Sequence, residues 1–279
     1  MKLLIAGASG NLGSHLSQHL MNGSHELRLL VHWSSLPFNI EGCQNVSCSR
    51  ADLARPETLE GVCTGIDCVV HLAGVLFAPL PERFLPKTNV DYVKNLVEAA
   101  KKAGVRKFIL VSFPHVEGET TPDHPATGRM DVNSNVIHFR TRLEAERQLL
   151  KACKDSSTTP VIFRSGIVYG REIKMVQAAR WLLRRRLMAV WRKPTWAHLI
   201  AFPDFLLALR AAIEGENVRG MTPRSLFRIF WTGWPITISI AARTGCRPGC
   251  STWPGSAWRW RPWCYGRLPL SIEISSGLE

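Results

Sequence analysis

Residues 3 to 13 read Leu-Leu-Ile-Ala-Gly-Ala-Ser-Gly-Asn-Leu-Gly, an apolar run followed by three spaced glycines. The residues after them, 12–20, repeat apolar positions as an amphipathic helix does. Gly7 allows a tight turn, Gly10 lets the backbone approach a phosphate, and Gly13 lets helix and strand pack closely. The first N–H groups of the helix then face an anion. This context predicts a pyrophosphate site, and an ordinary glycine-rich turn is the alternative. Its expected contacts are Gly7, Ser9, Gly10, Asn11, Leu12 and Gly13.

The composition limits the classes of protein that fit. A chain of 279 residues can bury one large domain, or one domain with a small lobe. The formal net charge of +13 favours phosphate-bearing or other anionic partners. We interpret the densest basic run, Arg184-Arg185-Arg186 with Arg180 before it and Arg192-Lys193 after it, as a solvated helix face, with nucleic-acid binding as the weaker alternative. No apolar stretch is long enough to predict a membrane span.

The eight cysteines follow no regular spacing. Cys246 and Cys250 have no second Cys or His pair at a distance typical of zinc sites, so we expect no metal. The first apolar run ends at Gly7, which is too early for a secretory leader. Reduced thiols and a cytoplasmic location are therefore expected.

Short apolar runs alternate with helical patterns through the first two thirds of the chain. We expect strands at residues 3–6, 26–31, 46–49, 68–72, 108–111 and 161–163. Helices are expected at residues 11–20, 56–62, 90–103 and 139–153. This alternation is typical of a parallel sheet with helices on both faces, so residues 1–170 predict an α/β, doubly wound parallel sheet.

The pattern changes after Gly170. Residues 171–219 predict a partial second lobe, with helices at 173–187 and 205–213 around an extended segment at 196–202. Residues 220–279 contain six of the ten Trp, seven Arg and thirteen Gly or Pro, but no Lys or Asp. Because GC-rich DNA read out of frame yields this surplus, we interpret 220–279 as an irregular tail in a shifted frame. A genuine Trp/Arg-rich binding tail is the alternative.

Further motifs follow the glycine turn in order. Asp52-Leu53 follows the third expected strand, His71-Leu72-Ala73-Gly74 ends the fourth, and Asn89 opens the next helix. Arg164-Ser165-Gly166-Ile167-Val168-Tyr169-Gly170 follows the sixth. In this combination, residues 1–213 resemble the extended short-chain dehydrogenases/reductases, the NAD-dependent epimerase/dehydratase group. The segment from Trp196-Ala-His198 to Asp204 is similar to that family's segment near the substrate lobe. The resemblance implies a Rossmann domain with a small, incomplete C-terminal substrate lobe. It also implies cofactor contacts at Asp52, Leu53, Leu72, Ala73, Gly74 and Asn89.

The catalytic set departs from the family's pattern. That family uses Ser or Thr after the fifth strand and Tyr-x-x-x-Lys on a helix, where Tyr is the acid/base and Lys lowers its pKa and binds the nicotinamide ribose. Here His138 stands at the Tyr position and Arg142 at the Lys position. Pro114 occupies the hydroxyl position, with Ser112 close by.

Two interpretations of this altered set remain open. In the first, His138 is the acid/base, Arg142 binds the cofactor ribose and Ser112 assists. The protein would then be an epimerase/dehydratase-like oxidoreductase acting on a nucleotide sugar or another alcohol or carbonyl compound. In the second, a non-catalytic assembly or regulatory protein binds the dinucleotide as a structural ligand. For His138, a partly buried polar residue without catalytic function is the plain alternative.

The end of the second strand bears on the choice between NAD and NADP. An acidic residue there would bind the ribose 2′-hydroxyl of NAD, but the sequence reads His32-Trp33-Ser34. His32, Ser34 and Arg50 could accommodate a 2′-phosphate, so NADP is favoured over NAD. Alternatively, His32 only packs at the strand end. Neither the substrate nor the oligomeric state follows from the sequence.

Overall fold

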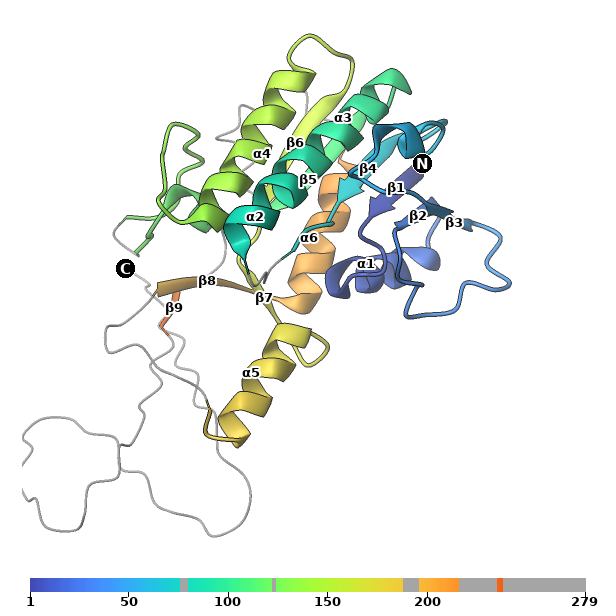
Figure 1. Cartoon of the computed structure of the whole chain (residues 1–279). Coiled ribbons are helices and arrows are strands. Elements are labelled where there is room, and N and C mark those ends of the chain that lie inside the picture. The colour runs from blue at the N-terminus through green and yellow to red at the C-terminus, as the bar shows by residue number, and fades with distance from the viewer. Residues whose placement is uncertain (76–79, 122–123, 188–195, 216–234, 238–279) are drawn as a thin grey trace, which may run out of the picture.

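The computed structural model describes residues 1–75, 80–121, 124–187, 196–215 and 235–237 (Figure 1). Its main sheet has six parallel strands in the order β3-β2-β1-β4-β5-β6. The strands are β1 (Lys2–Ala6), β2 (Glu26–Val31), β3 (Val46–Arg50), β4 (Cys68–His71), β5 (Lys107–Ser112) and β6 (Thr159–Arg164). The strand order reverses between β1 and β4, where open α/β sheets bind their ligands. The predicted doubly wound Rossmann fold is confirmed.

Helices cover both faces of this sheet (Figure 1). One face carries α1 (Asn11–Met21) and α6 (Phe202–Glu214), and the other carries α3 (Tyr92–Lys102) and α4 (Ile137–Cys153). Successive side chains of β1 point to opposite faces, so Leu3 and Ile5 join the α1–α6 core, whereas Leu4 and Ala6 join the α3–α4 core. Both cores therefore meet at β1, which holds the glycine turn at its carboxyl end.

Two expected helices differ from the prediction. Residues 56–62 form only one 3-10 turn, Pro56–Leu59. Asn89 does not open a helix, because α2 (Pro81–Leu85) continues through a π-helix, Pro86–Asp91, into α3. Pro86 has no N–H and its ring crowds the preceding turn, so the regular hydrogen-bond pattern is interrupted there and the wider turn forms. Asn89 consequently lies inside a long helical segment and is fully buried.

A second, three-stranded sheet consists of β7 (Ile167–Tyr169), β8 (Trp196–Ala201) and β9 (Pro235–Thr237). β9 lies in the segment 220–279, and the rest of that segment, including Cys246 and Cys250, is outside the described residues. The division into a domain at 1–170, a lobe at 171–219 and an irregular tail stays a prediction. So does the shifted reading frame.

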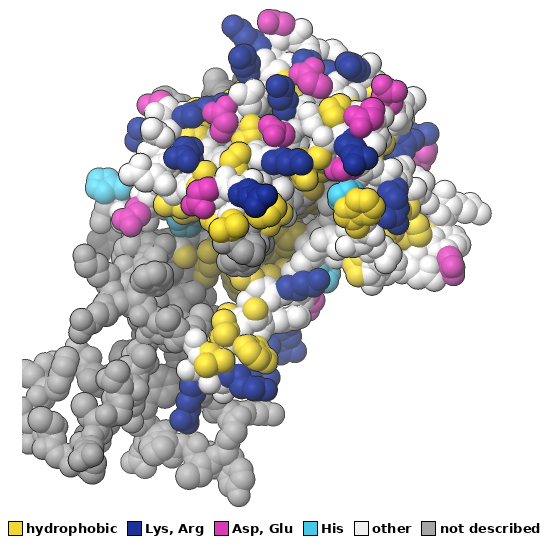
Figure 2. All heavy atoms as spheres, in the orientation of Figure 1, with side chains coloured by type: hydrophobic (Ala, Val, Ile, Leu, Met, Phe, Trp, Pro, Cys, Tyr) yellow, Lys and Arg dark blue, Asp and Glu magenta, His cyan; other side chains and the backbone are white. Residues whose placement is uncertain are grey.

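Charged side chains of both signs are mixed over the α3–α4 face, and basic ones gather on α5 (Lys174–Arg184), which projects from the body (Figures 1 and 2). Arg180, Arg184, Arg185 and Arg186 are exposed, with the Arg185 guanidinium carbon 5.3 Å from the centre of the Trp181 ring. Arg192 and Lys193 lie outside the described residues. Within the described ranges, no helix is both long and apolar enough to cross a membrane. The same ranges contain no group of three His, Cys, Asp or Glu residues arranged to hold a metal.

Candidate functional site

The glycine turn at residues 7–13 is too tightly packed to accept side chains. Gly7 has a φ of +90°, and a Cβ there would lie 2.7 Å from the Ala73 backbone nitrogen. A Cβ at Gly13 would lie 2.1 Å from the Gly7 carbonyl oxygen, and one at Gly10 would lie 3.1 Å from it. The turn therefore packs directly on the segment after β4. Gly7 has the tight-turn conformation and Gly13 the close packing that the sequence predicts. The role of Gly10 at a phosphate stays a prediction.

The amino end of α1 carries the polarity that an anion requires. Gly10 is its N-cap residue, no side chain caps the helix, and its first turn holds no acidic residue. The Asn11 side chain binds the backbone at the start of α5. Its Nδ2 donates to the Glu172 carbonyl at 3.1 Å, and its Oδ1 accepts from the Lys174 N–H at 2.8 Å. Ser9 and Leu12 are half-buried beside this turn. A side-chain-free helix start suits a pyrophosphate, so the turn fits the expected cofactor.

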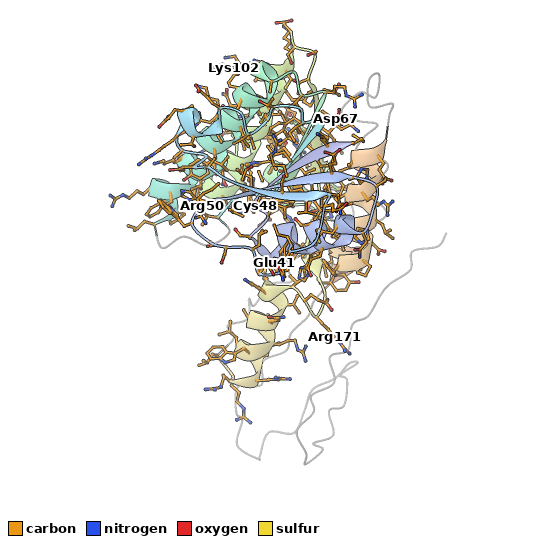
Figure 3. The ribbon with its side chains drawn as sticks, turned by 90° about the vertical axis from the view of Figure 1, so that its right-hand side faces the viewer. Glu41, Cys48, Arg50, Asp67, Lys102 and Arg171 are labelled. Carbon is orange, nitrogen blue, oxygen red and sulfur yellow. The ribbon has the colours of Figure 1, made fainter. Side chains whose placement is uncertain are left out.

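A second group of predicted residues meets where β2 and β3 end. Arg50 Nη1 donates to the carbonyls of His32 and Trp33, at 2.6 and 3.3 Å. The Asp52 carboxylate lies 3.6 Å from His32 Nε2 and accepts the Ala54 N–H at 2.8 Å. Figure 3 shows Arg50 on β3 at the edge of the sheet. Ser34, two residues after His32, is exposed. Leu53, which follows Asp52, is buried. The arrangement brings one cation, one histidine and one carboxylate to the strand ends.

The third group lies at the carboxyl end of β4, beneath α4. The Arg142 guanidinium is buried, with only 8% of the residue exposed, and its Nε and Nη1 have no hydrogen-bond partner among the described residues. Burial lowers the pKa of Arg142 to about 10, against the opposing effect of Glu146. His71 is fully buried beside it, and burial, followed by the Arg142 charge, lowers the pKa of His71 to about 3.

Asn89 belongs to the same buried group. Its Nδ2 donates to Thr141 Oγ1 at 3.0 Å, and its Oδ1 has no partner within the part of the chain that the structure describes. Buried polar atoms normally have partners, either in the protein or in water or ligand. The unpaired atoms of Asn89 and Arg142 are therefore candidates for hydrogen bonds to polar groups from outside the chain.

His138 lies one helical turn before Arg142, on the same face of α4. Its ring stacks on Phe113, with centroids 5.2 Å apart and planes inclined by 12°. Its Nδ1 is buried and has no partner among the described residues. Burial, followed by the Arg142 charge, lowers the pKa of His138. The lowered pKa favours the neutral imidazole, the form that can accept a proton.

Ser112 is placed differently from a free catalytic hydroxyl. Its Oγ donates to Glu146 Oε1, and Glu146 also accepts three hydrogen bonds from Arg164. Arg164 reaches on to Glu117, so a buried network joins β5, β6 and α4. Sequence reasoning missed Glu117 and Glu146, although Glu146 stands four residues after Arg142 and hence on its side of the helix. A catalytic role for Ser112 stays a prediction.

Three more residues near this end were not predicted as site residues. His198 Nε2 lies 2.7 Å from Thr120 Oγ1, and the His115 and His198 rings are 5.2 Å apart. His198 belongs to the segment that resembles the family's substrate-lobe region. The only sequence signal for Thr120 and His115 was their place in the segment after β5.

The sheet order and the glycine turn together are those of a Rossmann-type fold. The sequence profile of the NAD dependent epimerase/dehydratase family matches residues 3–193, and the chain belongs to that family. The predicted resemblance is thereby confirmed. A solved UDP-glucuronic acid 4-epimerase from Bacillus cereus, in complex with UDP-glucuronic acid and NAD, is 23% identical with a TM-score of 0.64. That alignment covers 78% of this chain and 74% of the other.

Relatives of this chain are named for different activities. A 3-beta-hydroxysteroid dehydrogenase from Mycolicibacterium neoaurum is 24% identical over 179 residues, 61% of this chain and 48% of the relative. A ceramide reductase from Caulobacter vibrioides is 36% identical over 111 residues, 39% of this chain and 33% of the relative. The chain thus spans about half the length, or less, of the curated relatives it matches.

Proposed function

We propose that the chain binds a nicotinamide dinucleotide across the carboxyl ends of β1 and β4 and acts as an oxidoreductase on an alcohol or carbonyl compound. The pyrophosphate lies over the turn at residues 7–13, and the nicotinamide end lies beside Arg142. The observation that carries this proposal is the buried Arg142 guanidinium, whose Nε and Nη1 have no partner among the described residues. A buried cation with free donors is costly unless something pairs with it.

In the proposed reaction, His138, Arg142 and Phe113 have separate roles. When bound, the cofactor supplies the hydride acceptor or donor. His138 Nε2 or Nδ1 takes the proton of a substrate alcohol, or returns it to a carbonyl oxygen in the reverse direction. Arg142 donates to hydroxyls of the nicotinamide ribose and keeps its charge throughout, so it is no proton relay. Phe113 stacks on the imidazole and restricts its orientation.

For the substrate class, we propose a nucleotide sugar or another alcohol or carbonyl compound. The solved relative holds UDP-glucuronic acid and NAD, whereas the curated relatives are named for steroid and ceramide substrates. All of these substrates offer an alcohol or carbonyl group. The chemistry is the same for each, and the part of the molecule that recognises the remainder of the substrate differs.

For the cofactor, we propose a preference for NADP over NAD. The end of β2 carries no carboxylate of its own, since His32, Trp33 and Ser34 stand there. Arg50 is held against this end by two carbonyls, which leaves the rest of its guanidinium for a 2′-phosphate. Asp52 opposes this preference, because its carboxylate lies close to His32. Replacing Arg50 by Ala should weaken NADPH binding more than NADH binding.

A specific observation also favours the second candidate, a non-catalytic dinucleotide-binding protein. The Ser112 hydroxyl donates its hydrogen bond to Glu146, and Pro114 stands where the family's Ser or Thr after the fifth strand is expected. The family's Ser and Tyr functions are therefore both altered. In this alternative, Arg142 and the glycine turn bind the dinucleotide and His138 takes no part in chemistry.

Hydride transfer separates the two candidates. The full chain is mixed with NAD or NADP and, in turn, UDP-glucuronic acid, UDP-glucose or a 3β-hydroxysteroid, and reduced-nicotinamide absorbance is followed. The nucleotide-sugar products are also separated, because an epimerisation returns the hydride to the sugar and leaves no net reduced nicotinamide. We expect turnover that falls by about 100-fold or more in His138→Ala with unchanged dinucleotide affinity, as for loss of a general acid/base. Retained turnover in His138→Ala would contradict the catalytic role. Dinucleotide binding without hydride transfer would favour the non-catalytic candidate.

A further inference from the structure

At position 74 a side chain is excluded for a different reason than at the glycines of the turn at residues 7–13. Its φ is outside the left-handed region, so the backbone there can carry any residue. A Cβ at Gly74, however, would lie 2.6 Å from Arg142 Nη2 and 3.4 Å from its Cζ. The three described atoms nearest to that absent side chain all belong to the guanidinium of Arg142.

A Cβ at position 74 would press on the buried end of a flexible side chain, so the guanidinium and not the backbone would have to shift. Arg142 is buried on α4, and His71, fully buried beneath it, carries a pKa that responds to the Arg142 charge. On the helix itself, the preceding Thr141 is fixed by its hydrogen bonds to Asn89 and to the Ile137 carbonyl. A group at position 74 would therefore push the guanidinium out of its place rather than slide past it.

We infer that Gly74 is a positioning residue for Arg142, and that the two form a matched pair at the cofactor's nicotinamide end. This inference rests on the proposed dinucleotide site. Glycine leaves the space that a planar guanidinium occupies, and the guanidinium holds its donors at the end of β4. A lysine at 142 is thinner and ends in one nitrogen instead of a fork. Lysine at 142 is therefore compatible with a Cβ at 74, whereas arginine is not.

A double-mutant cycle on the full chain tests this coupling. NADH and NADPH are titrated, by the fluorescence of the bound reduced nicotinamide, into the parent, Gly74→Ala, Arg142→Lys and the double variant. Because coupled neighbours deviate from additivity, we expect each single change to weaken binding by ~10-fold and the double variant to return to within ~3-fold of the parent. Independent effects would instead weaken the double variant by ~100-fold, and that result would overturn the inference.

Controls separate this effect from substitution in general. Gly23→Ala adds a Cβ at a glycine whose nearest neighbour would be 3.3 Å away, and Arg140→Lys changes an exposed arginine on the same helix. Both should bind like the parent. Either control weakening binding as much as its counterpart would overturn the assignment of Gly74 and Arg142 as the specific pair.

A second readout keeps the inference independent of the dinucleotide. If the parent binds neither NADH nor NADPH, the proposed function fails, and the same cycle is read from the melting temperatures of the four proteins without ligand. We expect Gly74→Ala to lower the melting temperature and the added Arg142→Lys change to restore most of it. Additive melting-temperature shifts would overturn the matched pair.

Discussion

Lowering the pH should destabilise this protein through His71 in particular. The ring is fully buried at the end of β4, it lies near the Arg142 charge, and its pKa falls from the ordinary value of 6.5 to about 3. The unfolded chain therefore binds a proton in the window between pH ~6.5 and ~3 that the folded chain does not bind. The stabilisation is fully present above the unfolded pKa and is lost as the pH falls through this window.

The magnitude follows from the difference between the two pKa values. One pKa unit corresponds to about 1.36 kcal/mol, so the complete effect is on the order of 5 kcal/mol once the pH is below ~3. Only part of this is lost under mild conditions. Between pH 7 and pH 5, His71 alone should reduce the free energy of unfolding by about 2 kcal/mol. That is a large share of the typical free energy of unfolding of a domain, about 5–15 kcal/mol.

Urea unfolding at a series of pH values measures this loss. The parent is compared with His71→Phe, which keeps an aromatic ring beside Phe108 and cannot titrate, and with His19→Gln, which removes an exposed histidine of α1. The parent should lose about 2 kcal/mol more than His71→Phe between pH 7 and pH 5, and His19→Gln should follow the parent. Parallel curves for the parent and His71→Phe would refute the reasoning.

Three further outcomes are expected. Gly13→Ala places a Cβ 2.1 Å from a backbone oxygen and should abolish NADH binding in a fluorescence titration, whereas Gly23→Ala should bind normally; equal affinities would exclude the turn as the phosphate site. Glu146→Ala leaves the buried Arg164 with one carboxylate and should cost about 3 kcal/mol in urea unfolding, whereas the half-exposed Glu144→Ala should stay within about 0.5 kcal/mol. Equal losses would show that the buried network does not stabilise the fold. Limited proteolysis should cut first beyond residue 219, where Trp, Arg, Gly and Pro follow no periodic pattern, and leave a fragment that binds NADH; a resistant tail would contradict the interpretation of 220–279.

Most of the fold could be read from the sequence because its signals are local. Strands buried on both faces appear as continuous apolar runs, and the expected strand at 26–31 coincides with β2. The glycine turn depends on backbone contacts between residues close in the sequence, so the spacing of Gly7, Gly10 and Gly13 predicts it directly. Bounds were less accurate where several weak preferences compete, as in the single 3-10 turn at Pro56–Leu59.

The remaining features depend on contacts between distant segments. From the sequence, Asn89 was expected to open a helix. In the structure, Pro86 interrupts the preceding turn and Asn89 lies inside the π-helix, where its side chain bonds to Thr141. Nothing local to Ser112 shows that Glu146, 34 residues later, accepts a hydrogen bond from its hydroxyl. The spacing of His138 and Arg142 predicted a shared helix face. It did not predict that Arg142 would be buried against Gly74.

The position of Arg142 at the nicotinamide end is the central claim, and a pair of ligands tests it most directly. NADH contains both ends of the dinucleotide, whereas ADP keeps the adenosine and the pyrophosphate but lacks the nicotinamide and its ribose. Both are titrated by calorimetry into the parent, Arg142→Ala and the exposed control Arg140→Ala. We predict that Arg142→Ala weakens NADH binding by ~100-fold and ADP binding by less than ~3-fold, while Arg140→Ala binds both like the parent. Unchanged NADH affinity in Arg142→Ala, or an equal loss for both ligands, would contradict the claim.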